Sequence, residues 1–153
     1  LMLLIGDDAV AFNRAFAASG LDRDILRFSS LIEENVLLAS GADNTRGLIT
    51  SAGFFEDLTT TAGLDFAATY FQRFGRDAPV LNSLGESCYE GVRMLTELIR
   101  RAGSAEVGAM TSVAEGLTYE SPRGTVEIQD RHLRQRVFLA VADGLSWDVV
   151  QQL

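Results

Sequence analysis

Few side chains in this sequence could act as acids, bases or nucleophiles, and none stands at a catalytic spacing. His132 is the single histidine and Cys88 the single cysteine, and no second His or Cys stands near His132 as a metal site would need. The acidic pairs Asp7-Asp8 and Glu33-Glu34 each lie on one helix, whereas glycosidases need carboxyl groups on both sides of a bond. We find no phosphate-binding loop, dinucleotide loop or nucleophile elbow. The sequence predicts no enzymatic activity, no metal and no cofactor.

Polar residues at the ends of predicted strands are better candidates, and their chemistry is ligand binding. Gly6 and Asp7 follow the apolar run Leu1–Ile5, and Ser30 follows a second short strand. Ligands of parallel α/β sheets bind at the carboxyl ends of strands, and a glycine lets a ligand approach the backbone. We therefore predict Gly6, Asp7 and Ser30 as ligand contacts. The alternatives are that Asp7 caps the next helix and that Ser30 forms a capping box with Glu33.

Four further candidates lie later in the chain. Phe54 and Phe55 follow the third predicted strand, where aromatic rings could shield an apolar part of a ligand. Glu86 and Tyr89 lie one helical turn apart and could face the same ligand. The alternatives are that both phenylalanines belong to the core and that Glu86 completes a capping box with Ser83.

The single cysteine and the single histidine are both interpreted as residues without a chemical role. Cys88 falls on the apolar face of a predicted helix, which predicts a buried and inert thiol. His132 has charged neighbours and is interpreted as a surface residue.

Composition excludes several classes of protein. The chain has 153 residues and a net charge of -8, and all 13 of its basic residues are arginines. Such a chain without a basic cluster is a poor binder of nucleic acid or anionic membrane. One cysteine allows no intrachain disulfide. Leu1–Ile5 is too short for a transmembrane helix and lacks the features of a signal peptide.

Hydrophobic periodicity divides the chain into two patterns. The first third alternates strand and helix, which predicts parallel strands with right-handed crossovers. Its expected strands are Leu1–Ile5, Ile25–Phe28 and Leu48–Ala52. After Phe55 an aromatic-striped helix should end at Gly75, and the longest helix should lie within residues 83–102. The remainder is strand-like, and its expected strands are Thr125–Ile128, Arg136–Ala142 and Trp147–Val150.

The order of these features resembles the type I solute-binding fold, and in particular its branched-chain amino acid, amide and urea branch. No single motif is specific, but their order and spacing together are. The segments that carry the resemblance are Leu4-Ile5-Gly6-Asp7, Gly20-Leu21, Phe28 to Glu34, Gly47 to Phe55, Phe71 to Gly75, Gly85 to Val92 and Glu120 to Val126. The sequence departs from the family pattern at two places, and both bear on which ligand is bound. Gly53-Phe54-Phe55 replaces the family's Pro-Tyr-Phe, and the proline expected after Thr59-Thr60-Thr61 is missing.

The resemblance implies an α/β fold, namely an incomplete, parallel-sheet, Rossmann-like lobe from the C-terminal half of such a receptor. Residues 1–52 would be a β-α-β-α-β segment of the second lobe. Residues 53–133 would be first-lobe helices and a strand after a hinge crossing. Residues 134–153 would return to the second lobe.

The same resemblance implies the function. Such receptors bind a small polar ligand (an amide, urea or amino acid) and present it to the membrane permease of an ABC uptake system, outside the cell or in the periplasm. The alternative is a cytoplasmic amide sensor of the amidase-regulator type, which acts on a regulatory protein. A small hydrolase would need a nucleophile and a base that we do not find. Because sheet edges and apolar faces would be exposed, we also expect a homo-oligomer.

Overall fold

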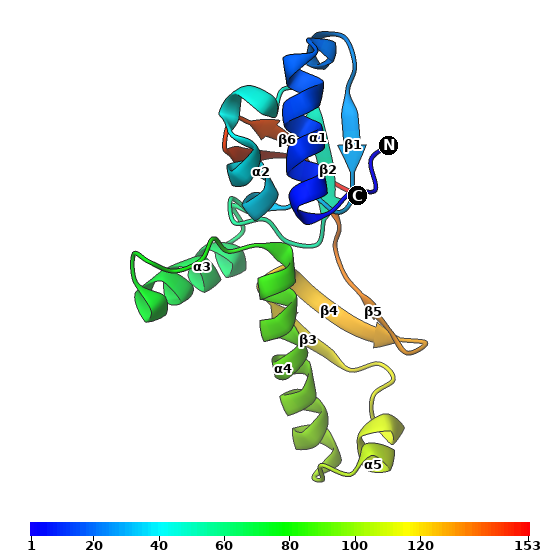
Figure 1. The fold of residues 1–153 in the computed structure, drawn as a ribbon. Helices are drawn as coiled ribbons and strands as arrows, with labels where there is room; N and C mark the ends of the chain where they lie inside the picture. Colours follow the sequence, from blue (N-terminus) through cyan, green and yellow to red (C-terminus); the bar gives the residue numbers. More distant parts are fainter.

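A four-stranded sheet and two helices make up the first of two units in the computed structural model, which describes residues 1–153 (Figure 1). The strand order is β1-β2-β6-β7. β1 and β2 run parallel, whereas β6 runs antiparallel to β2 and β7 antiparallel to β6. The helices pack against each other. The elements of this unit are α1 (Gly6–Ala18), β1 (Arg27–Ser29), α2 (Glu34–Ser40), β2 (Leu48–Ala52), β6 (Phe138–Asp143) and β7 (Ser146–Gln152).

The second unit lies between β2 and β6 in the sequence. It contains three helices and a separate antiparallel sheet of order β3-β4-β5. Figure 1 shows α4 running beside this sheet, with α3 projecting sideways. Two crossing segments, residues 53–60 and 135–137, connect the units. The elements are α3 (Thr61–Phe74), α4 (Ser83–Ala102), α5 (Val107–Ser112), β3 (Thr118–Ser121), β4 (Gly124–Gln129) and β5 (His132–Arg134).

The predicted alternation of strands and helices in residues 1–52 is confirmed for two of its three strands. β2 has the predicted bounds, and β1 lies close to its predicted place and is parallel to β2. The prediction for Leu1–Ile5 is wrong, because this segment is extended but forms no strand. A single backbone hydrogen bond, from Met2 N to Phe28 O at 2.7 Å, joins it to β1. Met2 is buried, whereas Leu1, Leu3 and Ile5 are exposed.

The helix caps differ from the predicted ones. Asp7 lies in the first turn of α1, but the N-cap is Ile5 and no side chain caps the helix. The N-cap of α2 is Glu33, again without a side-chain cap, so Ser30 and Glu33 form no capping box. At α4 the Asn82 side chain is the cap and accepts from Gly85 N at 2.8 Å. Both capping-box predictions and the Asp7 cap are therefore wrong.

The two long helices of the second unit are confirmed. α3 ends at Gly75, whose φ of 76° favours glycine, and α4 is the longest helix, with 20 residues. The apolar face of α4 is nevertheless exposed, and the prediction of a buried Cys88 is wrong. Val92 is 66% and Leu95 46% exposed.

One apolar core runs from the first unit into the crossing. Its 13 buried residues include Leu37, Leu48 and Trp147 from the first unit and Phe54 and Phe55 from the first crossing segment. Leu81, just before α4, belongs to the same cluster. The core therefore extends from the first sheet to the residues just before α4.

Candidate functional site

Three of the predicted contacts lie on the edge of the first unit that faces the second unit. Because β1 and β2 are parallel, their carboxyl ends share that edge, and the N-terminal end of α1 lies there too (Figure 1). Gly6, Asp7 and Ser30 are all exposed. Ser29 is buried instead, and its hydroxyl accepts from Leu31 N at 3.1 Å. The Ser30 hydroxyl and the Asp7 carboxylate are therefore exposed, and neither makes a hydrogen bond within the chain.

The two phenylalanines of the first crossing segment are core residues. Phe54 is 0% and Phe55 1% exposed. The Phe54 ring meets Phe66 of α3 edge-on at 5.8 Å, and the Phe55 ring lies 6.0 Å from Trp147 of β7. Neither ring has surface left for a ligand in this arrangement. The prediction that they contact a ligand is replaced by a packing role at the crossing.

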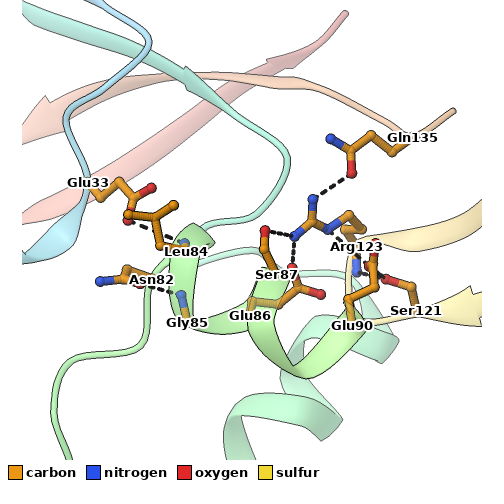
Figure 2. A network of polar contacts seen from close by, with 10 residues as sticks. All are labelled: Glu33, Asn82, Leu84, Gly85, Glu86, Ser87, Glu90, Ser121, Arg123 and Gln135. Carbon is orange, nitrogen blue, oxygen red and sulfur yellow. Dashed lines mark hydrogen bonds and ion pairs between the residues drawn. The ribbon is translucent and has the colours of Figure 1, made fainter. Parts of the chain in front are cut away.

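Glu86 is also inside the protein, where it pairs with Arg123 (Figure 2). Arg123 lies in the turn between β3 and β4 and is 4% exposed. Its guanidinium forms ion pairs with Glu86 and, through Nε at 3.2 Å, with Glu90. It also donates to Ser87 Oγ at 2.8 Å and to Gln135 Oε1 at 2.5 Å. Glu86 is thus committed to this cluster and is not free for a ligand.

The Arg123 cluster holds both crossing segments at one point. Gln135 belongs to the second crossing segment. Gly53 begins the first, and a Cβ built on it would lie 2.8 Å from a guanidinium nitrogen of Arg123. Only glycine lets the chain pass so close to a clamped side chain. One guanidinium therefore bonds α4 to the second crossing segment and lies against the first.

Burial dominates the electrostatics of this cluster. Two buried carboxylates, Glu86 and Glu90, face one cation. Burial raises the pKa of Glu90, and the hydroxyl of Ser121 partly offsets this by donating a hydrogen bond. Burial lowers the pKa of Arg123 to about 10, which leaves the guanidinium charged at neutral pH.

Tyr89 lies apart from the three exposed contacts and faces a cavity of its own. Its ring lies 4.8 Å from Phe66, and its hydroxyl accepts from Arg93 at 3.2 Å. It lines a cavity of about 810 Å³ between α3, α4 and the end of β3. None of Gly6, Asp7 and Ser30 lines this cavity. The structure therefore does not bring Tyr89 together with the other predicted contacts.

Sequence reasoning also missed the role of the acidic pair at the start of α2. Glu34 is 4% exposed; one of its oxygens accepts from Glu56 N at 3.0 Å, and the other has no partner. Burial, reinforced by the charges of Glu33 and Glu56, raises the pKa of Glu34 to about 7. Glu33 reaches the other unit and accepts from Leu84 N at 3.4 Å. The only sequence signal was their adjacency.

The raised pKa of Glu34 predicts a pH-dependent stability. A carboxyl group whose pKa is higher in the folded chain stabilises the fold below its ordinary pKa, and this contribution is lost as the pH rises. The free energy of unfolding should therefore fall by about 3 kcal/mol, on account of Glu34, as the pH rises from 4.5 to about 7. Glu34→Gln should remove this part of the fall. Urea unfolding at several pH values, followed by the fluorescence of the single tryptophan Trp147, measures it.

The control for that prediction is Glu106→Gln, which changes an exposed glutamate at the start of α5. This variant should keep the pH dependence of the parent chain. Equal pH dependence in the parent and Glu34→Gln would contradict the assignment.

The reactive side chains outside this region form no site. His132 is exposed on β5, with Nδ1 2.7 Å from the carbonyl oxygen of Asp130. No group of three or more His, Cys, Asp or Glu side chains is placed to hold a metal ion. None of the helices combines the length and apolar character needed to span a membrane.

The comparison with family models decides the relationship. The model described as periplasmic binding protein matches residues 1–145. The chain belongs to the periplasmic binding protein family. No curated protein matches it by sequence.

Solved structures of periplasmic binding proteins share the fold at low sequence identity. A substrate-binding protein of an amino acid ABC transporter from Pseudomonas fluorescens superposes with a TM-score of 0.84 at 16% identity, covering 99% of this chain and 43% of that one. A solute-binding protein from Rhodopseudomonas palustris, in complex with 3,4-dihydroxybenzoic acid, gives 0.79 at 21% identity, with 99% and 43% covered. A leucine-binding protein from Thermotoga maritima gives 0.75 at 16%, with 97% and 43% covered. The chain thus spans less than half the length of these relatives and has the α/β lobe architecture of the family.

Proposed function

We propose that this chain is the ligand-binding part of a solute-binding protein that serves an ABC uptake system. The observation that carries the proposal is an exposed polar edge of the first unit, formed by Gly6 and Asp7 at the start of α1 and Ser30 directly after β1. This edge faces the second unit, which is joined to the first by two crossing segments (Figure 1). A ligand held there would touch both units, and hinge motion about the crossing would close the units on it. The protein would bind without chemistry and deliver its ligand to a membrane permease, outside the cytoplasm.

The ligand we propose is a small polar organic molecule with a hydrogen-bonding group for Asp7 and Ser30. Amides, ureas and amino acids fit this description, as the resemblance of the sequence implied. Two relatives carry an amino acid transport or leucine-binding description and a third holds a dihydroxybenzoate, so hydroxybenzoates belong in the same test. A cytoplasmic amide sensor has less support, because the relatives named above are transport or leucine-binding proteins. Assembly into a homo-oligomer stays a prediction, for which the exposed apolar face of α4 is the surface to examine.

Calorimetric titration of the protein with these four ligand classes tests the proposal. We expect one class to bind, and Asp7→Ala and Ser30→Ala each to weaken binding about tenfold, the value of one lost hydrogen bond to a charged or polar group. Both side chains are exposed, so the melting temperature without ligand should not change.

The matched control is Asp43→Ala, which removes an exposed aspartate from the opposite edge of the first sheet, ahead of β2. It should bind like the parent chain. Full binding by both Asp7→Ala and Ser30→Ala would show that the ligand lies elsewhere.

A further inference from the structure

One hydrogen bond joins the body of the first unit to α4. Glu33, in the loop before α2, accepts from Leu84 N at 3.4 Å (Figure 2). No other hydrogen bond or ion pair connects residues 1–52 with residues 61–134. The first unit is also hydrogen-bonded to the first crossing segment, through Glu34 and Glu56 and through Trp147 and Asp57. Apart from the crossing segments and apolar packing, Glu33 therefore makes the one direct polar contact between the units.

This bond is dispensable for both of the elements that it connects. Asn82 already caps α4 through Gly85 N, so the helix keeps a cap when Glu33 leaves. The Glu33 side chain makes no other hydrogen bond, and its backbone carbonyl alone accepts from Val36 and Leu37 at the start of α2. The bond can break while each unit keeps its own structure.

The contact is nevertheless favourable where it stands. The N-terminus of a long helix carries a partial positive charge that attracts a carboxylate. Burial raises the pKa of Glu33, and the hydrogen bond from Leu84 lowers it again in part. The first unit thus presents a half-buried acceptor to a site on the second unit that attracts negative charge.

The Arg123 cluster supplies the fixed point that such a contact needs. It ties Glu86 and Ser87 of α4 to Gln135, and Gly53 passes against the same guanidinium. Rotation of the units about this point changes the distance between Glu33 and Leu84 while the crossing segments stay attached to α4. The start of α4 therefore combines a permanent attachment with a breakable one.

We propose that Glu33 is a latch between the two units, made with Leu84 N in the arrangement seen here and released when the units separate. Its role in retaining a ligand rests on the proposed function. The latch itself is a property of the chain without ligand, and it is tested without one.

Distance measurements between two spin labels test the latch. Cys88, the only cysteine, is exposed on α4 and takes one label; Asp43→Cys on the first unit takes the other. In the labelled parent chain we expect one narrow distance distribution. Glu33→Ala should broaden it and shift its mean. Glu33→Asp, which keeps the charge but shortens the reach by one methylene, should do the same, whereas Glu33→Gln keeps an acceptor oxygen and should stay near the parent.

The matched control is Glu97→Ala, which removes a glutamate from α4 whose partner, Arg100, is on the same helix. It should leave the distribution unchanged. Unchanged distributions in both Glu33→Ala and Glu33→Asp would overturn the latch, even if the protein binds a ligand. A shifted distribution in a protein that binds none of the four ligand classes would support the latch and remove the proposed function.

Discussion

Replacing Arg123 with methionine should lower the free energy of unfolding by about 3–5 kcal/mol at neutral pH, the cost of leaving buried charges without their partner. Methionine fills a similar volume but leaves Glu86 and Glu90 buried with no cation. The loss should shrink as the pH falls, because a carboxyl group deprived of its cation has a raised pKa and regains its stability once protonated. Urea unfolding near pH 7 and near pH 4.5 measures both effects.

The ion pair of the exposed Arg100 with the half-buried Glu97 provides the matched control. The Arg100 side chain is 75% exposed, so Arg100→Met should cost no more than about 1 kcal/mol. The double variant Glu86→Leu/Arg123→Met should recover part of the loss at neutral pH, because one of the unpaired carboxylates is then gone. A loss in Arg123→Met no larger than in Arg100→Met would show that the cluster does not hold the crossing together.

The second large effect is expected at Phe54. Phe54→Ala should cost about 3–5 kcal/mol, as truncation of a fully buried aromatic ring does. The Phe54 ring meets Phe66 of α3 edge-on, so its loss should loosen α3 in particular. Relative to the parent chain, we therefore expect Phe54→Ala to speed amide hydrogen exchange more in α3 than in the first sheet. Thermal unfolding and hydrogen exchange measured by mass spectrometry check the two parts.

Phe74→Ala is the control, since it removes the same kind of ring from the end of α3, where Phe74 is 60% exposed. It should cost less than about 1 kcal/mol. Exchange that rises equally throughout the chain in Phe54→Ala would contradict a specific role in seating α3.

Much of the fold could be predicted because its signals are local. Leu48–Ala52 is a short strand that opens with two apolar residues between turns, and the stop of α3 at Gly75 depends on a single residue type. The missed hairpin strand β5 is short and polar. The turn before it, Asp130-Arg131, takes positive φ at both residues without the glycine that usually marks such a turn.

The candidate site was harder to predict because its decisive contacts are distant in sequence. Glu86 has the spacing of a capping box with Ser83, yet its partner is Arg123, which follows only after the whole of α4 and α5. Spacing rules hold for residues within one turn and say nothing about such a pair. The place of Ser30 could be predicted, because it directly follows β1 and the carboxyl ends of parallel strands meet at one edge whatever the long-range contacts are. Gly6 and Asp7 begin α1 at the same edge although Leu1–Ile5 forms no strand, and a role of the three residues in ligand binding stays a prediction. The exposure of Cys88 on an apolar helix face depends on what packs there, which helical periodicity does not reveal.

The antiparallel pairing of β2 with β6 has a consequence for how the chain acquires its structure. Ile49 pairs with Val141, so the central strand of the first sheet finds one of its two neighbours only after the entire second unit has been made. On the ribosome, β1 and β2 would emerge well before β6 with one edge unpaired, and closing so long a loop is slow. The nascent first unit would therefore spend much of its synthesis as an open-edged intermediate. Chaperone dependence and co-translational aggregation should thus be governed by when β6 and β7 leave the exit tunnel.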